Sequence, residues 1–212
     1  MQNHCTIKSS LLDRGYPEVF LDHTSYSAIK SIYEKPYLEF EGANIVLYNE
    51  ETGAFTDYEI QANGIMPQGQ IPTADLSLTW SVSKNSTGSE YFVMYSYEWL
   101  NLPFWRWQDP IGVSWDSTKF EMKDDTFYKV DMYDGFYSTD PEYEEFYGAI
   151  KSEEYGYAKG FNSGVTWYAD LVGYLGITAI ALYGHGEFTL TKLATTSGST
   201  TLYGHYVSSE SL

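Results

Sequence analysis

Acidic and aromatic side chains are interleaved in residues 124–147, DDTFYKVDMYDGFYSTDPEYEEFY. Carboxylate oxygens are the ligands that Ca²⁺ prefers, and its six to eight ligands often come from loops far apart in sequence. An EF-hand loop does not fit, because Gly135 at position 6 puts Val130 at position 1 and Pro141 at position 12, where oxygen ligands are required. The sequence predicts a looser calcium site, with ligands Asp131, Asp134, Asp140 and Glu142. The alternative is a solvated acidic rim that its Tyr and Phe rings anchor to the core.

A second candidate site lies in residues 100–115, LNLPFWRWQDPIGVSW. In an extended chain Trp105 and Trp107 project to one side and Arg106 to the other. Exposed indole rings stack on sugar faces, and neighbouring amide and carboxylate groups bind hydroxyls. The predicted ligand-binding residues are Trp105, Trp107, Gln108, Asp109, Trp115 and Asp116. If the rings are buried they fill the core instead, where one Trp is worth on the order of a few kcal/mol.

The tetrapeptide LYGH occurs twice, at residues 182–185 and 202–205. Two histidines in matching contexts suggest a zinc site. We expect the two segments to form one hairpin with its turn near Ser197, which offsets His185 from His205 by about four residues, or about 13 Å. In that register the two histidines do not share an ion.

Motifs for covalent catalysis are not evident in the sequence. There is no G-x-S-x-G elbow, and no βαβ pattern surrounds a serine. Cys5 lies near the chain terminus, where it has no visible scaffold for a Cys–His pair. No glycine loop followed by a helix is present to bind phosphate. The paired carboxylates of a glycoside hydrolase remain open, because their separation is spatial.

Charge and composition narrow the class of protein. The 212 residues include 29 acids and 12 bases, for a net charge of −17. A clustered basic surface is absent, so we expect neither nucleic-acid binding nor attraction to anionic membranes. Cys5 is the only cysteine, which rules out an internal disulfide. An aromatic content of 18%, with 18 glycines, favours strands and turns over helices.

Compartment and membrane topology are predicted from two further segments. The first residues, MQNHCTIKSSLL, lack the basic and apolar regions of a signal peptide, which fits a cytoplasmic protein or a processed secreted one. The richness in Tyr, Trp, Gly, Ser and Thr favours an extracellular or cell-surface location. The longest apolar stretch, residues 167–184, contains Asp170 and several glycines. We therefore expect a pair of buried strands there and no transmembrane span.

The sequence pattern changes near residue 36. Residues 1–35 predict a helical lead-in, because four apolar residues follow a helical spacing after Thr24 or Ser25 as N-cap; they are Ala28, Ile29, Ile32 and Tyr33. We expect this segment to pack on a main domain formed by residues 36–212. In residues 76–83, LSLTWSVS, apolar and hydroxyl side chains alternate strictly, as in a strand with two different faces.

Paired strands are expected along residues 36–212. The predicted hairpins join segments 38–60 through Gly53, 76–83 with 91–100, 111–115 with 118–122, and 177–193 with 199–209, and a further strand covers 127–133. This number of short strands predicts a mainly β protein, an antiparallel β-sandwich or barrel with a short N-terminal helical segment.

Two segments carry a family resemblance. LLDRGYPEVFLDHTSYSAIKSIYE at residues 11–34, followed by QDPIGVSWDSTKFEM at residues 108–122, resembles a loose group of uncharacterised secreted proteins of Gram-positive bacteria. Members of that group combine a Gly-Tyr-Pro helical lead-in with an aromatic-rich β-domain. The resemblance covers most of the chain and implies secretion and a similar fold. It implies no function and no catalytic residue.

Together these features predict a non-enzymatic extracellular or cell-envelope β-domain that acts in adhesion, assembly or ligand binding. One alternative is a carbohydrate-active protein, either a sugar-binding module or a glycoside hydrolase. Another is a fibre or ring subunit in which an exposed strand edge pairs with a neighbour. The predicted partners are carbohydrate or another envelope protein, Ca²⁺ is the one candidate cofactor, and the oligomeric state stays open.

Overall fold

The computed structural model describes residues 4–49, 51–61, 74–100, 108–123, 128–140, 143–155, 159–161, 163–170, 177–193 and 202–206. Its helices are α1 (His4–Asp13), α2 (Glu18–Asp22) and α3 (Tyr26–Tyr33). Its strands are β1 (Glu39–Asn49), β2 (Ala54–Gln61), β3 (Leu76–Lys84), β4 (Glu90–Trp99), β5 (Gln108–Ser114), β6 (Phe120–Met122), β7 (Tyr128–Asp140), β8 (Tyr143–Tyr155), β9 (Lys159–Phe161), β10 (Gly164–Asp170), β11 (Ile177–Lys192) and β12 (Tyr203–Tyr206).

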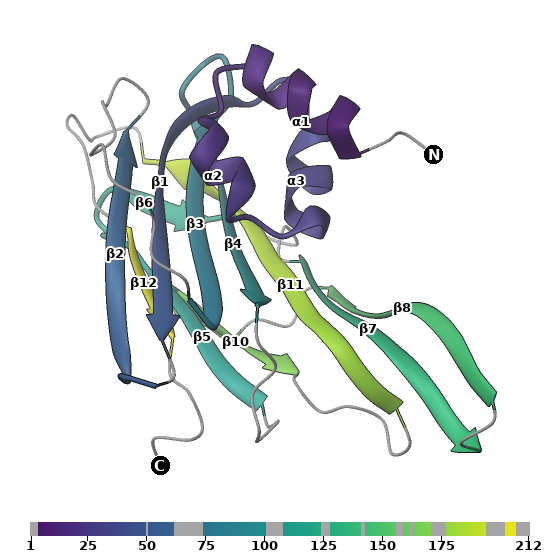
Figure 1. The fold of residues 1–212 in the computed structure, drawn as a ribbon. Helices are drawn as coiled ribbons and strands as arrows, with labels where there is room; N and C mark the ends of the chain where they lie inside the picture. Colours follow the sequence, from purple (N-terminus) through teal and green to yellow (C-terminus); the bar gives the residue numbers. More distant parts are fainter. Residues whose placement is uncertain are drawn as a thin grey trace.

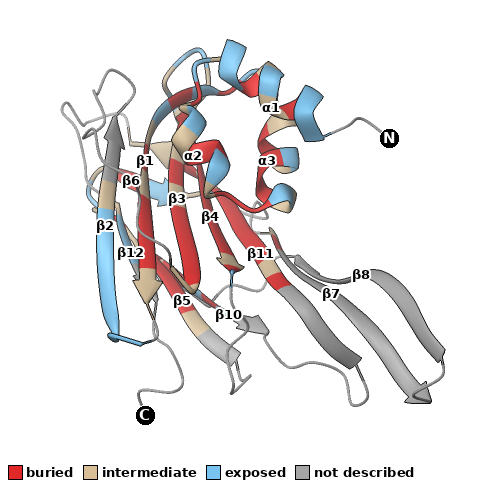
Figure 2. Cartoon of the chain, in the orientation of Figure 1, coloured by how far each residue is buried: buried red, intermediate tan, exposed pale blue. Residues whose placement is uncertain are grey.

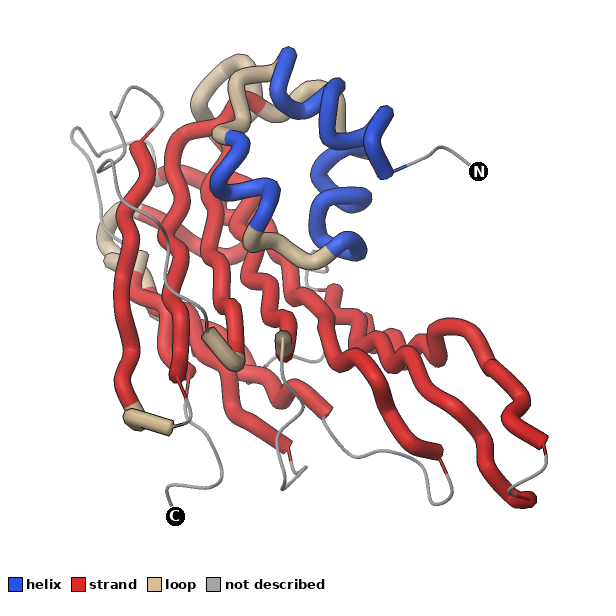
Figure 3. The backbone as a smooth tube through the Cα atoms, viewed as in Figure 1, coloured by secondary structure: helices blue, strands red, loops and turns tan. Residues whose placement is uncertain are grey.

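These strands form two antiparallel sheets (Figures 1 and 3). The large sheet has the order β2-β1-β3-β4-β11-β7-β8, and β6 pairs with β11 beside this path. The small sheet has the order β12-β5-β10-β9. The prediction of a mainly β, antiparallel fold with an N-terminal helical segment is confirmed, and the two sheets pack as a sandwich.

Strict alternation along β3 explains how the large sheet packs on both sides. Leu76 and Leu78 are buried in the cluster between the two sheets, whereas Ser77 and Thr79 are buried on the opposite face. That opposite face is covered by the helical layer, in which α2 and α3 contact the sheet and α1 packs on α3 (Figure 1). The described part of the chain therefore has three layers: helices, large sheet and small sheet.

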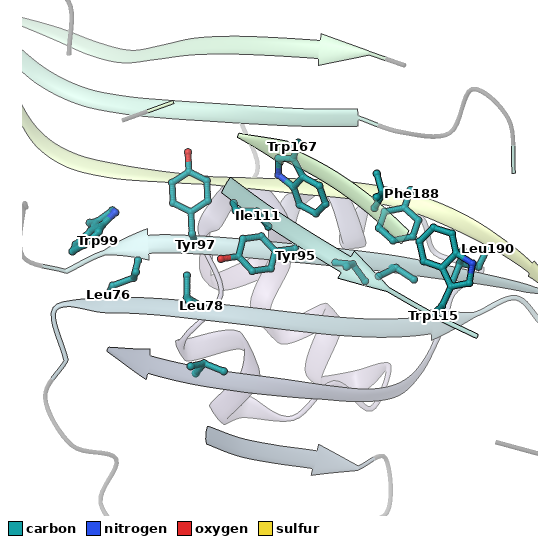
Figure 4. Packing of buried hydrophobic residues seen from close by; sticks show 14 of the residues in the cluster. Leu76, Leu78, Tyr95, Tyr97, Trp99, Ile111, Trp115, Trp167, Phe188 and Leu190 are labelled. Carbon is teal, nitrogen blue, oxygen red and sulfur yellow. The ribbon is translucent and has the colours of Figure 1, made fainter. Parts of the chain in front are cut away.

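The space between the sheets is filled by aliphatic side chains and large aromatic rings (Figure 4). Tyr95 meets Trp167 edge to face at 5.8 Å between ring centroids, and Trp115 packs on Phe188 at 5.6 Å. Such pairs add to the free energy gained from burial alone. Gly186 of β11 is required beside Trp167, because a Cβ there would lie 2.7 Å from an indole carbon.

The helical layer has the predicted helix at its centre. Ala28, Ile29 and Ile32 of α3 are buried, and the exposed side of each helix faces away from the sheet (Figure 2). The guanidinium of Arg14 donates to the carbonyls of Ile32, Lys35 and Leu38 at 2.8–3.3 Å. One side chain thus satisfies backbone carbonyls at and beyond the end of α3, where helices leave acceptors unpaired.

The predicted hairpins are confirmed in part. β1 pairs with β2 across a turn in which Gly53 has a φ of 63°, and β3 pairs with β4. The hairpin expected at 111–122 is wrong, because β5 pairs with β10 and β12 while β6 pairs with β11. The hairpin expected at 177–209 is also wrong, because β11 lies in the large sheet and β12 in the small one. Both long edges of β5 and β11 are taken by strands from elsewhere in the chain.

The apolar stretch at residues 167–184 contributes to β10 and β11, which belong to different sheets. Two strands are present in this stretch, as expected. They do not pair with each other, so the expectation of a strand pair is wrong. Among the described residues, no helix has the length and apolar character needed to cross a membrane.

Candidate functional site

The outer face of the small sheet carries two exposed tyrosines. Tyr168 of β10 is 54% exposed and Tyr203 of β12 is 60% exposed. Tyr168 lies opposite Pro110 of β5 and Tyr203 opposite Ser114 of the same strand. Pro110 and Ser114 are separated by an even number of residues, so both tyrosines share one face of the sheet.

The strand between the two tyrosines presents small residues to that face. Pro110 and Ser114 are half-buried and Gly112 is buried, and they alternate with Ile111 and Val113, which are buried between the sheets. The tyrosines are offset by about four residues along β5 and by two strand spacings across it, so their Cα atoms are about 16 Å apart. The two exposed phenol rings therefore lie on opposite sides of β5.

Contacts with the large sheet fix the position of β10, which carries Tyr168. Trp167 and Val165 of β10 are buried against the large sheet. Lys129 of β7 is also buried, and its Nζ donates to the backbone carbonyl of Tyr168 at 2.6 Å. Pro110, opposite Tyr168, has no N–H to offer. A charge-assisted bond from the large sheet therefore fixes the backbone that carries one exposed ring.

A second polar cluster lies between α3 and β11, which we call the α3–β11 cluster; it comprises Ser27, Ser31, Lys35, His185 and Glu187. Lys35 Nζ is 2.9 Å from Glu187 Oε1, and the Ser31 hydroxyl donates to Glu187 Oε2. Lys35 Nζ also donates to Ser31 Oγ at 2.6 Å. His185 and Glu187 are two positions apart on β11, so both side chains point toward the helices.

The charges of the α3–β11 cluster are set by its neighbours. Burial raises the pKa of the Glu187 carboxyl, but His185, Lys35 and Ser31 outweigh burial and lower this pKa to about 2. Glu187 is thus an ionised carboxylate over the whole physiological range. A buried carboxylate with a cation and a hydroxyl donor meets the usual requirement that buried charges be paired.

The imidazole of His185 links this carboxylate to a serine. His185 is 3% exposed, and its Nδ1 lies 3.0 Å from the hydroxyl oxygen of Ser27. Its Nε2 lies 3.6 Å from Glu187 Oε2, which is beyond hydrogen-bond distance. The cluster thus places a serine, a histidine and a glutamate in series.

Hydroxyl side chains continue from this cluster toward β3. Ser96 Oγ accepts a bond from the Ser25 N–H at 3.0 Å and donates to Ser25 Oγ. Thr24 donates to Thr79, and the Tyr16 hydroxyl is 3.0 Å from Ser83 Oγ. Hydrogen bonds therefore fasten the helical layer along much of the described sheet surface beneath it.

The residues predicted to bind a ligand are not gathered by the described structure. Trp105 and Trp107 lie outside the described residues, and Gln108 and Asp109 begin β5. Trp115 is 4% exposed in the core between the sheets, so its ring presents no face to a surface ligand. Asp116 caps a turn, accepting bonds from the N–H and hydroxyl of Thr118, which lower the pKa of its carboxyl.

The residues predicted to bind calcium are spread along one strand. Asp131, Asp134 and Asp140 belong to β7, and Glu142 lies outside the described residues. Asp131 lies near the start of β7 and Asp140 at its end, so their Cα atoms are on the order of 25 Å apart. One Ca²⁺ takes its oxygens from within about 2.6 Å. The backbone of β7 therefore does not bring these aspartates together around one ion.

The two LYGH segments lie in different sheets. His185 of β11 lies opposite Ser96, whereas His205 of β12 lies opposite Gly112 in the other sheet. Among the described residues, no group of three or more His, Cys, Asp or Glu side chains is placed to hold a metal ion.

Sequence reasoning missed both the tyrosine face and the α3–β11 cluster. In residues 164–170, GVTWYAD, the alternation of Val165 and Trp167 with Thr166 and Tyr168 is a readable sign that Tyr168 points outward. The cluster offered no such sign, because it joins residues that are far apart in the sequence.

No protein-family model matches the chain, and neither a curated protein nor a solved structure shows significant similarity to it.

Proposed function

We propose that this protein is a binding domain of the cell exterior or envelope, and that it binds an extended carbohydrate on the outer face of the small sheet. The observation that supports the proposal best is the pair of exposed tyrosines, Tyr168 and Tyr203, on one face of the sheet with small residues between them. Exposed tyrosines offer rigid ring surface and a hydroxyl at low cost in side-chain entropy.

The spacing and charge of the surface narrow the ligand class. Rings whose Cα atoms are about 16 Å apart are too distant to contact one monosaccharide together, so an oligosaccharide or polysaccharide chain is favoured. Stacking on the rings supplies apolar contact, and the phenol hydroxyls supply hydrogen bonds. The net charge of −17 favours neutral or cationic glycans over anionic ones.

The test is binding to a panel of neutral, cationic and anionic polysaccharides, followed by titration calorimetry on those that bind. Tyr168→Ala and Tyr203→Ala should each weaken binding about tenfold or more, and the double variant should abolish it. Tyr37→Ala is the matched control, because Tyr37 is 63% exposed but lies before β1, outside the small sheet. Circular dichroism and melting temperature should be unchanged in all of these variants.

Two outcomes would contradict the proposal. One is the absence of binding to every glycan of the panel by folded protein. The other is full binding by the double tyrosine variant. Trp105→Ala and Trp107→Ala belong in the same experiment, because loss of binding in these variants alone would move the site to residues 105–107.

Assembly through a strand edge is the second candidate function. β2 is the outermost strand of the large sheet on its side, its residues 54–57 are exposed, and Phe55 is 50% exposed. Unpaired edge strands are templates for pairing with another chain. Light scattering over a range of concentrations should then show oligomers that Thr56→Pro abolishes, whereas a protein that stays monomeric would remove this candidate.

A further inference from the structure

We propose that Ser27 is the nucleophile of an acyl-transfer site, with His185 as its general base and Glu187 as the carboxylate that orients the imidazole. The inference goes beyond the glycan-binding function and does not rest on it. The α3–β11 cluster lies on the helix-covered side of the large sheet, whereas Tyr168 and Tyr203 lie on the outer side of the small sheet.

The order of the three groups fits an activated serine. A serine hydroxyl is a weak nucleophile until an adjacent base takes its proton. Nδ1 of His185 is 3.0 Å from Ser27 Oγ, within the range for proton transfer. The carboxylate 3.6 Å from Nε2 favours the imidazole tautomer protonated at Nε2, which leaves Nδ1 free to accept the proton of Ser27. The same carboxylate stabilises the imidazolium that forms.

Backbone donors stand beside the serine. Ser27 lies in the first turn of α3, where the N–H groups have no acceptor within the helix and the helix dipole is positive. Ser25 occupies the N-cap position, but its side chain makes no capping bond. Its hydroxyl instead lies 3.2 Å from Ser27 Oγ and donates to the carbonyl of Gly184. The N–H groups of this turn are suited to stabilise an oxyanion.

Exposure also fits the roles. Ser27 is partly exposed, whereas His185 and Glu187 are buried. The nucleophile thus comes from a residue that reaches the surface, whereas the base and its carboxylate stay in a region of low dielectric. Lys35 donates to Oε1 of Glu187, and Ser31 donates to Oε2, the same oxygen that faces His185.

The reaction is hydrolysis of an ester in two steps. Ser27 Oγ attacks the carbonyl carbon as its proton passes to His185 Nδ1, and the imidazolium returns that proton to the leaving alcohol when the C–O bond breaks. Water then attacks the acyl-serine, giving its proton to His185, and the acid leaves as Ser27 recovers a proton. No oxidant or cofactor enters this balance.

The test uses a fluorophosphonate probe on the full chain, with the labelled residue identified by peptide mass spectrometry. We expect a single adduct on Ser27, formed with loss of fluoride. Ser27→Ala should remove it, and His185→Gln should slow it at least about 100-fold, because glutamine keeps a polar side chain but cannot take the proton. Ser86→Ala, in an exposed loop, is the matched control and should label at the normal rate.

Each result decides the proposal. Labelling of Ser27 that His185→Gln suppresses, with hydrolysis of p-nitrophenyl acetate falling in parallel, supports it. No adduct on folded protein, an adduct on another residue only, or labelling of Ser27 that is unchanged in His185→Gln would overturn it. Glu187→Gln is the second variant, since it preserves shape and should slow labelling even if His185→Gln unfolds. Near-ultraviolet circular dichroism establishes folding in each case.

Discussion

The two faces of the large sheet are packed by different chemistry. On the side of the small sheet the buried residues are aliphatic and aromatic, among them Trp115, Trp167 and Phe188. On the side of the helices, apolar residues share the surface with buried hydroxyls and with the ion pair of Lys35 and Glu187. The same strands supply both faces, because successive side chains point to opposite sides.

The difference indicates a division of roles. The free energy gained from burying apolar surface is non-directional and grows with the area buried. Hydrogen bonds and buried ion pairs add less net stability, but each costs free energy when its partner is misplaced. We infer that apolar burial stabilises both sides, and that the hydrogen bonds and ion pair of the helix side also fix where α3 sits on the sheet. Four predictions test this comparison.

Truncation of Trp167 should produce the largest effect. Trp167→Ala removes a ring that is 4% exposed and packs against Tyr95, so we expect a loss of about 3 to 5 kcal/mol in the free energy of unfolding. Denaturant titration measures it. Tyr168→Ala, the neighbouring residue with an exposed side chain, should change stability by less than about 0.5 kcal/mol. Equal losses at both positions would contradict the assignment of faces.

Removal of the buried carboxylate of Glu187 should have the second-largest effect on stability. Glu187→Ala removes the carboxylate that pairs with Lys35 and accepts from Ser31, and we expect a loss of about 3 kcal/mol in the free energy of unfolding. The double variant Lys35→Met, Glu187→Leu should lose less than Glu187→Ala, because no charge is then left unpaired. A double variant less stable than the single one would show that the ion pair itself contributes net stability.

Lowering the pH should reduce the stability that the helix side contributes through the ionised carboxylate of Glu187. The pKa of Glu187 is about 2 in the folded protein, below its ordinary value of 4.5, so the unfolded chain binds this proton at higher pH than the folded one. The stabilisation is complete above about pH 5 and is lost as the pH falls toward 2. By pH 3 the loss from this group should be about 2 kcal/mol. Between pH 6 and pH 3 the free energy of unfolding should fall less steeply with pH in Glu187→Gln than in the wild-type protein. Identical slopes would argue against a lowered pKa of Glu187.

Deletion of one hydroxyl should have the smallest effect. Ser96→Ala removes the acceptor of the Ser25 N–H, and we expect a loss of about 1 kcal/mol. Hydrogen exchange at the start of α3 should speed up more than exchange in β4, because the bond fastens the helix. A uniform increase across the sheet would indicate that Ser96 supports the large sheet as a whole.

The sequence was informative where the signal was local. Alternation in residues 76–83 predicted both faces of β3, and the apolar spacing after Ser25 predicted α3. The hairpins expected at 111–122 and 177–209 were wrong, since adjacency along the chain does not decide which strands pair once both edges of a strand have other partners. Distant partners are invisible to local patterns.

The candidate sites show the same limit. The outward position of Tyr168 follows from alternation in its strand, but its partnership with Tyr203 depends on β5 lying between β10 and β12. Ser27 and His185 are far apart in sequence, and only the placement of α3 over β11 brings them within 3.0 Å. Charge counts likewise predicted an acidic protein without indicating that Glu187 is buried.

The position of β11 in the chain has a consequence for synthesis. This strand pairs with β4, β6 and β7, yet it begins only at residue 177. While the chain emerges from the ribosome, the edge of β4 lacks its neighbour and Lys35 lacks its carboxylate until residues 177–192 have been made. Folding must therefore close contacts between distant parts of the chain, which slows it, and the incomplete sheet is the species most exposed to aggregation and to chaperones.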